Sequence, residues 1–366
     1  MPRHLPVLDG LRGVAVLLVM WCHVPAHTPG YPSWLNAALM LVGPGSLGVE
    51  IFFVLSGFLI TRILLAERAA GTPLRWFLLR RAFRIFPAYY VLLLLLLPTR
   101  PLDEIAWCAI YLHNLDAILR PHATPLGHTW SLCVEEHFYL MWPPLVAFAA
   151  AATAARVLAW AVLPLAFAGA VLVGCTVHSD YVMNAVQHGS PFRFFSLGAG
   201  CLLAFHERPL LERSRARALV VAGCLAVALA MHPLLLYVLG PWWSGRLWLP
   251  LELQQATWLL HSTSLATAIV LLGIGTRATG RSPLRLLTWS PLRGVGRISY
   301  GLYLYHFPIY WALLLHAPTP ALAAAAIVLT FVAAIVSYWM LERPLLRYAG
   351  RFRGAPPPSA IVGASA

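Results

Sequence analysis

Residues 83–100 read FRIFPAYYVLLLLLLPTR, and this stretch decides the fold class. Within it, the block 84–98 holds one charged side chain, Arg84, ahead of the unbroken apolar run 91–97. Amphipathic surface helices of soluble proteins keep one polar face, which this run lacks. Backbone polar groups in the hydrocarbon of a bilayer must be satisfied internally, so the block is predicted to be a membrane-spanning helix.

Similar apolar blocks recur along the whole chain. Ten of them are predicted to span the membrane, at residues 10–25, 46–65, 84–98, 129–151, 156–177, 191–206, 217–239, 256–276, 296–316 and 320–341. An eleventh block is predicted to be an outer-side segment instead, because its polar side chains are too many for a span. These side chains, within 103–119, are Asp103, Glu104, His113, Asn114 and Asp116. The predicted fold is all-α, a polytopic transmembrane helical bundle of about ten spans.

Arginine-rich connections set the predicted orientation. The basic segments are 62–84, 208–217, 277–293 and the tail from Arg343. Cytoplasmic loops of membrane proteins carry an excess of basic residues, so all four are predicted to lie inside the cell. This requires an even number of crossings between residues 84 and 208, which holds when the eleventh block is not a span. The chain is therefore predicted to be a multi-pass protein of the cell (inner) membrane with both termini in the cytoplasm.

The overall composition argues against the main alternatives. Of 366 residues, 60% are hydrophobic and 11% are charged, whereas a soluble domain carries about 25% charged residues. The net charge of +13 comes from arginine alone and lies in short connections, which argues against a nucleic-acid partner. Six scattered cysteines form no metal or disulfide pattern. One membrane domain at 1–350 is predicted, followed by a Pro-rich disordered tail at 351–366.

The first span, LDGLRGVAVLLVMWCH at 8–23, carries Arg12 and His23. Their spacing puts both on one helix face, about 16 Å apart along the axis. Arg12 is expected near the cytoplasmic edge, where Asp9 can pair with it, and His23 toward the outer side. Ionisable residues inside spans usually mark functional paths, although Arg12 alone fits a snorkelling side chain equally well.

The second span, GVEIFFVLSGFLI at 48–60, contributes Glu50, Ser56 and Gly57. A carboxylate inside a span needs a partner or a ligand, so Glu50 is a candidate for substrate binding. Ser56 and Gly57 either allow close helix packing or let a ligand approach the backbone. Cofactor binding is the functional interpretation of this pair.

The stretch RWFLLRRAFRIFPAYY places Arg80, Arg81 and Arg84 at the cytoplasmic entrance of the third span. A single arginine there would serve as a membrane anchor. A cluster beside aromatic side chains can also grip phosphate groups through charge-assisted hydrogen bonds. The cluster therefore favours a phosphorylated donor that arrives from the cytoplasm.

The stretch HTWSLCVEEHFYLMWP at 128–143 is the most informative. One helix face presents five polar or aromatic side chains, which are His128, Ser131, Glu135, Tyr139 and Trp142. A purely structural span needs no such face, while Glu136 points elsewhere. A later stretch, GRISYGLYLYHFPIYW, places His306 in the middle of a span between Tyr303 and Tyr310.

These residues together favour acid–base chemistry without a metal. Histidine is the natural general base at neutral pH, and a carboxylate can orient its ring. No GxSxG motif is present, so a serine nucleophile is not expected. Direct transfer of an acyl group to an acceptor hydroxyl that His23 deprotonates is favoured, and a route through an acyl-His intermediate stays open. The predicted catalytic residues are His23, Glu135, Glu136 and Arg12. The predicted substrate-binding residues are Glu50, His128, Trp130, Tyr139 and His306.

In their order along the chain, these motifs resemble the membrane acyltransferase-3 family of the O-antigen acetylase type. The matching pieces are LDGLRG…H (8–23), FFVLSGFLI (52–60), RRAFRIFP (80–87), WSLCVEEHFYLMWP (130–143), ISYGLYLYHFPI (298–309) and ERP (342–344). Three family motifs fall on Arg12 with His23, on Arg81 with Arg84, and on Ser56 with Gly57.

The resemblance implies a ten-helix enzyme that takes an acyl group, with acetyl expected, from cytoplasmic acyl-CoA. The acceptor would be a sugar hydroxyl of an envelope glycan or of a glycosylated natural product such as a macrolide. The arginines would hold the CoA phosphates, and Glu135 or Glu136 would orient His23 or the acceptor hydroxyl. A stand-alone member is expected, because many relatives carry a C-terminal hydrolase-like domain that this sequence lacks.

Three other interpretations remain. A transporter could use the intramembrane histidines and carboxylates as a proton relay, but no inverted repeat is visible. A receptor or assembly factor would not need all the motif residues intact. Succinyl or longer-chain transfer on the same scaffold, and a homo-oligomer, are left open.

Overall fold

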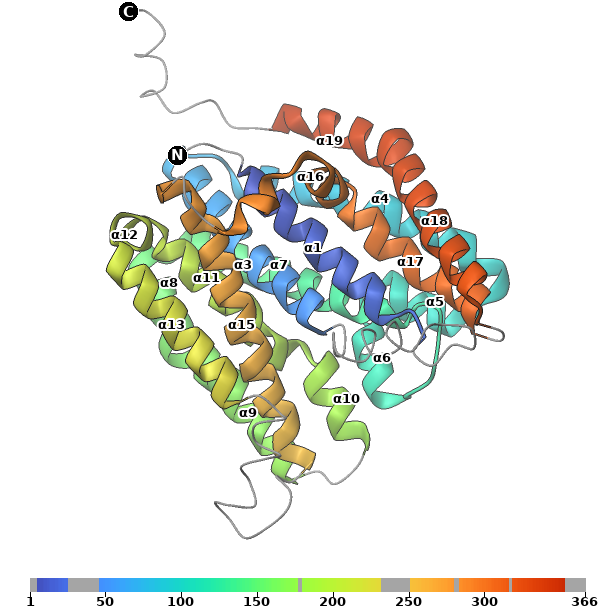
Figure 1. The fold of residues 1–366 in the computed structure, drawn as a ribbon, viewed down its shortest axis with the longest axis horizontal. Helices are drawn as coiled ribbons and strands as arrows, with labels where there is room; N and C mark the ends of the chain where they lie inside the picture. Colours follow the sequence, from blue (N-terminus) through green and yellow to red (C-terminus); the bar gives the residue numbers. More distant parts are fainter. Residues whose placement is uncertain are drawn as a thin grey trace, which may run out of the picture.

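The computed structural model describes residues 5–25, 46–176, 180–231, 251–279, 283–315 and 318–352, and these residues form helices with no strand among them (Figure 1). The longer helices are α1 (Pro6–Cys22), α3 (Ser46–Ala69), α4 (Leu74–Leu96), α7 (Trp130–Phe148), α9 (Leu163–Thr176), α11 (Ser190–Phe205), α13 (Ser214–Ala230), α15 (Leu251–Thr279), α17 (Ser299–Leu314) and α18 (Pro320–Ser337). The shorter elements are η1 (Leu97–Thr99), α5 (Leu102–Ala109), α6 (His113–Leu119), η2 (Gly127–Thr129), α8 (Ala151–Val157), η3 (Leu158–Val162), α10 (Asp180–His188), α12 (Glu207–Glu212), η4 (Pro283–Thr288), α16 (Ser290–Arg297), η5 (Tyr338–Glu342), α19 (Arg343–Ala349) and η6 (Gly350–Phe352).

Each of the ten predicted spans overlaps a described helix or helices joined in line, and residues 232–239 of the predicted span 217–239 lie outside the described residues. The π-turn η3 joins α8 to α9, and η5 joins α18 to α19, because a π-turn widens a helix without ending it. By length and composition, five helices of the described chain can cross a bilayer: Leu47–Ala69, Leu74–Thr99, Ala151–Val173, Thr257–Gly275 and Pro320–Phe352. The predicted all-α polytopic membrane bundle is confirmed.

The eleventh apolar block is not a span. It forms the two short helices α5 and α6, of 8 and 7 residues, which meet at Tyr111 with a left-handed backbone φ of 57°. Each helix is only about 12 Å long, well short of a hydrocarbon core of about 30 Å. This is the outcome that its polar side chains predicted.

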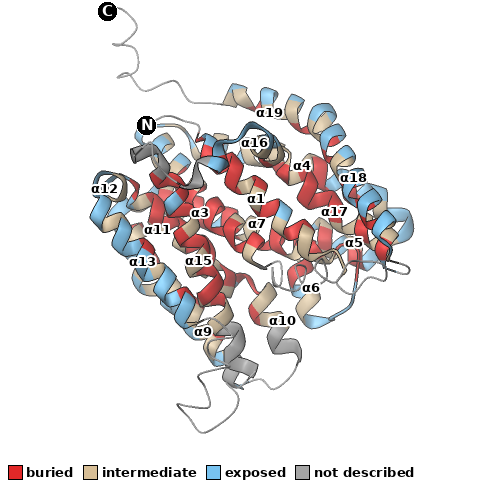
Figure 2. Ribbon diagram, in the orientation of Figure 1, coloured by how far each residue is buried: buried red, intermediate tan, exposed pale blue. Residues whose placement is uncertain are grey.

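The helices differ in how much of their surface the protein covers. In the apolar part of α3 and α15, 67% of the residues are buried, against 17% for Ala151–Val173 and 22% for Pro320–Phe352. Figure 2 shows the same contrast between a buried centre and an exposed rim. Rim helices expose large apolar side chains such as Leu94, Leu219 and Met340. An apolar rim of this extent fits contact with lipid.

The basic connections gather at one end of the bundle. Arg62 of α3 pairs with Glu207 of α12 at 2.8 Å, and Arg297 of α16 lies 4.0 Å from Asp9 of α1. Asp9 lies beyond ion-pair distance of Arg12, the pairing predicted within α1, although its charge still acts on that guanidinium. Figure 1 shows α12 and α16 at the end where α1 begins, and α6 and α10 at the opposite end. The membrane orientation of these two ends stays a prediction.

The packed chain continues slightly past the predicted domain boundary at 350. The η6 residue Phe352 stacks on Trp76 and Phe83, with ring centroids 5.2 Å and 5.9 Å apart. Arg80 also donates a hydrogen bond to the Phe352 carbonyl. The rest of the predicted disordered tail lies outside the described residues.

Candidate active site

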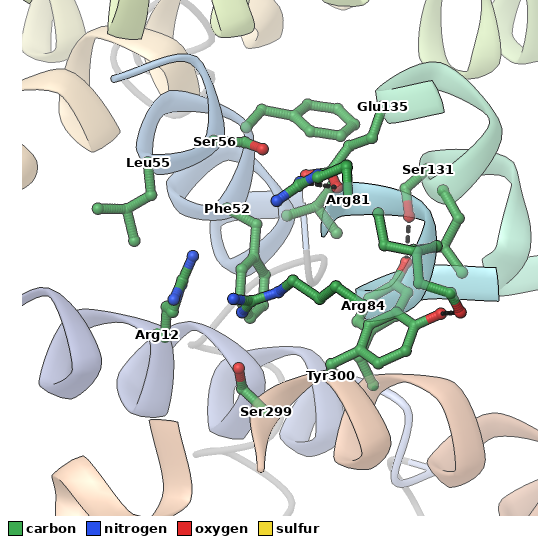
Figure 3. A pocket seen from close by; sticks show the side chains of 15 residues that line it. Arg12, Phe52, Leu55, Ser56, Arg81, Arg84, Ser131, Glu135, Ser299 and Tyr300 are labelled. Carbon is green, nitrogen blue, oxygen red and sulfur yellow. Dashed lines mark hydrogen bonds and ion pairs between the residues drawn. The ribbon is translucent and has the colours of Figure 1, made fainter. Parts of the chain in front are cut away.

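A cavity of about 710 Å³, counting the space at its open mouth, lies between α1, α3, α4, α7 and α17 (Figure 3). Its polar lining consists of Arg12, Ser56, Arg81, Arg84, Ser131, Glu135, Ser299, Tyr300 and Tyr303. Its apolar lining consists of Val49, Phe52, Phe53, Leu55, Ile85 and Leu132. A cavity with a few polar groups on an apolar wall suits a ligand that has a charged head and an apolar arm.

Three guanidinium groups dominate the charge of this cavity. Arg12 comes from α1, and Arg81 and Arg84 come from α4 (Figure 3). Glu135 is the one acidic residue in the described lining, so three cations and one carboxylate leave a charge of +2. Within the described part of the chain, Arg12 and Arg84 make no hydrogen bond or ion pair. Uncompensated cations inside a membrane bundle are costly, so this part of the cavity suits an anion.

Arg81 differs from the other two because α7 holds it in place. Its guanidinium lies 3.9 Å from the Glu135 carboxylate and 3.9 Å from the centre of the Tyr139 ring, and it donates to the Tyr139 hydroxyl. That hydroxyl donates to Glu135 at 2.8 Å, so Ser56 must donate the 2.5 Å bond that joins it to Tyr139. One network thus ties α3, α4 and α7 together beside the cavity.

A histidine cluster, defined as His23, His128 and His306, lies beyond the inner end of the cavity. His306 Nε2 lies 3.3 Å from His23 Nδ1, and the rings of His128 and His306 are 5.3 Å apart. Phe307 packs against His23 and His128, with ring centroids 4.8 Å and 5.3 Å away. Three histidines that are far apart in sequence therefore meet at the end of α1.

Backbone carbonyls indicate where the protons of two histidines sit. His306 Nδ1 lies 2.6 Å from the Tyr303 carbonyl oxygen, and His23 Nδ1 lies 2.8 Å from that of Val19. A carbonyl can only accept, so both Nδ1 atoms carry a proton and each neutral ring has a bare Nε2. Among the described residues, His23 Nε2 has no hydrogen-bond partner. Its lone pair is therefore open to a ligand.

Ser131 and Tyr303 connect the cavity with the histidine cluster. Both line the cavity, and their hydroxyls share a hydrogen bond of 2.5 Å (Figure 3). The Tyr303 hydroxyl also donates to the His128 backbone carbonyl at 2.9 Å. His306 follows Tyr303 by one turn of α17. The cavity and the cluster are therefore neighbouring parts of one site.

Comparison with known proteins agrees with this geometry. A family model described as an acyltransferase domain matches residues 5–341. The chain belongs to the acyltransferase-3 family. No solved structure matches the chain significantly.

Three curated relatives of this acyltransferase-3 chain are named as O-acetyltransferases, one of them putative. The peptidoglycan O-acetyltransferase OatA of Listeria monocytogenes serovar 1/2a is 30% identical, over 94% of this chain and 56% of the relative. The putative peptidoglycan O-acetyltransferase YrhL of Bacillus subtilis is 30% identical, over 94% of this chain and 55% of the relative. The O-acetyltransferase OatA of Staphylococcus aureus strain NCTC 8325 is 30% identical, over 84% and 51%. The chain spans about half the length of the curated relatives it matches.

The acyltransferase-3 motifs divide between the two parts of the site. Arg12, Ser56, Arg81 and Arg84 line the cavity, whereas His23 belongs to the histidine cluster. The first helix therefore bridges both parts, with about 16 Å of helix between its arginine and its histidine.

Two residues predicted to bind the cofactor lie outside the cavity. Arg80 pairs with Glu67 and with the C-terminal turn, because its side chain starts one turn nearer the beginning of α4 than Arg84. At Gly57, a Cβ atom would lie 1.9 Å from the carbonyl oxygen of Leu197. Gly57 thus permits the close crossing of α3 and α11, which was the packing alternative. Both findings correct the predicted cofactor-binding set.

Two residues predicted to bind substrate also face away from the cavity. Glu50 is fully buried, pairs with Arg193 of α11 and accepts a hydrogen bond from Thr263 at 3.4 Å. The Trp130 ring packs against His188 at 4.9 Å, and the Arg193 guanidinium lies 5.3 Å from its centre. Glu50 and Trp130 therefore belong to a contact between α3, α7, α10 and α11, which corrects their predicted placement.

The predicted carboxylate that orients His23 is not found. Glu135 is engaged by Tyr139 and Arg81, and the Val19 carbonyl takes the orienting place at His23. Glu136 is not in the cavity lining, and its buried Oε1 has no hydrogen-bond partner in the described structure. Both carboxylates are thus separate from the His23 imidazole, and the alternative that one of them orients the acceptor hydroxyl stays a prediction.

Sequence reasoning missed Tyr300 of the cavity wall and Arg193 of the buried ion pair. Tyr300 lies one turn before Tyr303 and two turns before His306, so the helical spacing on α17 could have indicated it. Arg193 is a charge inside a predicted span, and such a charge requires a partner on another span. Glu50 was the available partner.

Proposed function

We propose that this chain is an integral membrane O-acyltransferase that moves an acetyl group from acetyl-CoA to a sugar hydroxyl. The acceptor is a sugar of an envelope glycan or of a glycosylated natural product such as a macrolide. The observation that carries the proposal is a cationic cavity with unpaired Arg12 and Arg84, joined to a histidine whose Nε2 is open. The O-acetyltransferase names of two relatives support acetyl as the group, and the peptidoglycan in the name of the Listeria relative supports a glycan as the acceptor.

The donor binds with its phosphates at the arginines. The guanidinium N–H groups of Arg12 and Arg84 make no hydrogen bond within the described residues. Charge-assisted hydrogen bonds from guanidinium to phosphate are strong and directional. From there the donor needs an arm of about 16 Å to bring its thioester to His23, and the pantetheine arm of CoA is long and uncharged. The apolar wall with Phe52 and Leu55 gives this arm a dry path.

His23 acts as the general base. Its Nε2 takes the proton of the acceptor hydroxyl, and the oxygen attacks the thioester carbonyl. The new C–O bond forms as the C–S bond breaks, and the departing sulfur takes the proton back from His23. The products are the acetyl ester and the free CoA thiol. The Val19 carbonyl, which accepts from His23 Nδ1, favours the charged imidazolium during the transfer.

The same lone pair also allows a two-step route. In that route His23 Nε2 attacks the thioester carbonyl, the C–S bond breaks and CoA leaves as the thiolate. The acceptor hydroxyl then attacks the acetyl-imidazolium, the C–N bond breaks, and the hydroxyl proton passes to the thiolate. In either route the arginine end faces the cytoplasm, as do both termini, and the histidine cluster lies toward the outer side. This orientation follows from the basic connections gathered at the arginine end.

Purified full-length protein in proteoliposomes tests the proposal. With water in the place of the acceptor hydroxyl, incubation with acetyl-CoA should release free CoA thiol, detectable with a thiol reagent, and His23→Ala should not release it. Absence of release by the wild type would refute the proposal. Solute uptake without any acyl-CoA requirement would instead favour the transporter. A kcat/KM for succinyl-CoA above that for acetyl-CoA would favour the longer acyl group.

The acceptor class is tested in cells. Mass spectrometry of envelope glycans and secreted glycosides, with and without the gene, should reveal an acetyl ester that depends on the gene. Identical spectra would contradict a sugar acceptor.

A further inference from the structure

A second group of polar side chains adjoins the histidine cluster on the side away from the arginines. This polar shell consists of His113, Asn114, Asp116, His128 and His188. His113, Asn114, Asp116 and His128 are each at least 97% buried, and His188 is half-buried. His113 begins α6, His128 lies in η2, and His188 ends α10. The shell thus forms where three short elements meet.

The shell contains buried polar atoms that have no hydrogen-bond partner in the described structure. They are Nδ1 and Nε2 of His113, Oδ1 of Asn114, Oδ2 of Asp116, Nδ1 of His128 and Nδ1 of His188. A buried polar atom without a partner costs the full penalty of its desolvation, and native proteins keep few of them. His113 Nδ1 and Asp116 Oδ2 face each other at 3.6 Å as a loose ion pair. The other four atoms indicate partners that the described part of the chain does not supply.

The other atoms of these side chains are firmly held, which makes the unpartnered ones directional. Asn114 Nδ2 donates to the His188 carbonyl at 3.2 Å and to Ser190 Oγ at 3.1 Å. Asp116 Oδ1 accepts from Arg120 at 2.7 Å, and His128 Nε2 donates to the Leu304 carbonyl at 3.1 Å. Asn114, Asp116 and His128 thus each have one side-chain atom fixed by the protein and another without a hydrogen bond in the described structure.

The shell is continuous with the proposed catalytic centre. His128 belongs to both groups, and its ring lies 5.3 Å from that of His306, which in turn contacts His23. The imidazole of His113 is near enough to those of His128 and His188 to interact electrostatically with both. A ligand held by the shell would therefore meet His23 from the side opposite the cationic cavity.

The chemistry of the unpartnered atoms selects the ligand class. Asn114 Oδ1 and Asp116 Oδ2 only accept hydrogen bonds, whereas neutral His113 offers one donor and one acceptor. Hydroxyl groups both donate and accept, so several hydroxyls on one ring match this set. The Asp116 carboxylate disfavours an anionic ligand such as a phosphate.

We propose that this polar shell binds the hydroxyls of the saccharide acceptor and places one of them at His23. The proposal rests on the proposed function, because it assigns the acceptor side of the same site. The unpartnered atoms are closed off in this structure, so the acceptor reaches them when the seven-residue helix α6 shifts away from α10.

Two substitutions, His113→Phe and His188→Phe, remove the ring nitrogens but keep a planar aromatic ring at each position. His122→Phe is the matched control, because His122 is exposed in the segment after α6, with its ring 6.5 Å from that of His113. The probe is the tetrasaccharide of N-acetylglucosamine, added to the full-length protein in detergent. Three quantities are measured: binding of the probe by tryptophan fluorescence, acetyl transfer to it, and release of CoA thiol without acceptor.

Both shell variants should raise the KM and Kd for the tetrasaccharide roughly 10-fold, as expected for one lost hydrogen bond that leaves its partner unpaired. The KM for acetyl-CoA and the acceptor-free release of thiol should stay unchanged in both variants, and His122→Phe should match the wild type. The melting temperature should hold in His188→Phe, whereas His113→Phe also loses the ion pair with Asp116. Unchanged KM and Kd in both variants would overturn the proposal. Unfolding of both variants would overturn it too, because the nitrogens would then have structural partners.

Two further outcomes separate this proposal from the proposed function. A wild type that releases thiol but neither binds nor acetylates the tetrasaccharide would overturn the saccharide shell and leave the acyl-CoA site intact. A wild type that binds the tetrasaccharide but releases no thiol would refute the acyl-CoA function and support the shell.

Discussion

Arg84→Gln should weaken the binding of the acetyl-CoA donor without unfolding the protein. Arg84 lines the cavity and makes no hydrogen bond or ion pair within the described residues, although Arg81 repels it and Glu342 attracts it from a longer distance. One hydrogen bond to a charged group contributes about 1.5–3 kcal/mol, which corresponds to a rise of about 10- to 150-fold in the KM for acetyl-CoA. Solvent at the open mouth screens the charges and favours the lower half of that range. The melting temperature should hold or rise, because one of three neighbouring cations is removed.

The assay compares two donors and two variants. S-acetylpantetheine has the same thioester but no nucleotide phosphates, so its KM should not respond to Arg84→Gln. Arg80→Gln is the matched control, because Arg80 lies on the same helix but pairs with Glu67 outside the cavity. It should leave the KM for acetyl-CoA unchanged and should lower the melting temperature instead.

Three results would refute the phosphate role of Arg84. The KM for both donors could rise equally, which would indicate a change in shape rather than a lost phosphate contact. The kcat could fall while the KM for acetyl-CoA stays constant. Arg80→Gln could raise that KM as much as Arg84→Gln does, which would indicate a general effect of charge at this end of the bundle.

Three other substitutions probe the catalytic base and the packing. His23→Ala should lower kcat/KM by about 100-fold or more while the protein still inserts and elutes as the wild type, and full activity would exclude it as the base. Gly57→Ala would place a Cβ atom 1.9 Å from a backbone carbonyl of α11 and should lower the melting temperature, whereas Gly223→Ala, with open space around it, should not; equal melting temperatures would contradict the close crossing. Glu50→Gln should destabilise the protein by about 3–5 kcal/mol by leaving Arg193 as an unpaired buried charge, and replacing both by leucine should recover much of this loss. A single variant as stable as the wild type would mean that the pair is not buried in the membrane protein.

The helix content and the connections were accessible from the sequence because the bilayer imposes a local rule. Each apolar block must satisfy its own backbone, so its length and composition alone predict a helix. The polar side chains of 103–119 made that block unsuitable for lipid, and it folds as two short helices. The spacing of Ser131 and Glu135 on one helix face also predicted the polar wall of α7, since that spacing is a property of a single helix, and Tyr139 on the same face holds Glu135.

Contacts between helices were not accessible in this way. Glu50 and Trp130 look functional when each helix is considered alone. In the structure, Arg193 of α11 forms an ion pair with Glu50 and packs on the ring of Trp130. Arg80 and Arg84 are alike in sequence, and only the position of Glu67 on α3 separates them. Gly57 and Ser56 are adjacent, yet one faces the neighbouring helix α11 and the other the cavity.

The sequence by itself determined that this chain is a bundle of membrane helices with arginines at one end and histidines in several spans. It did so because helix formation in lipid depends on each segment separately. Only the tertiary structure decided that His23, His128 and His306 meet, that Arg12 and Arg84 line one cavity, and that Val19 rather than a glutamate orients His23. These contacts depend on the crossing angles and rotations of the helices. Because many side chains from several helices pack together to set them, no single segment of sequence determines them.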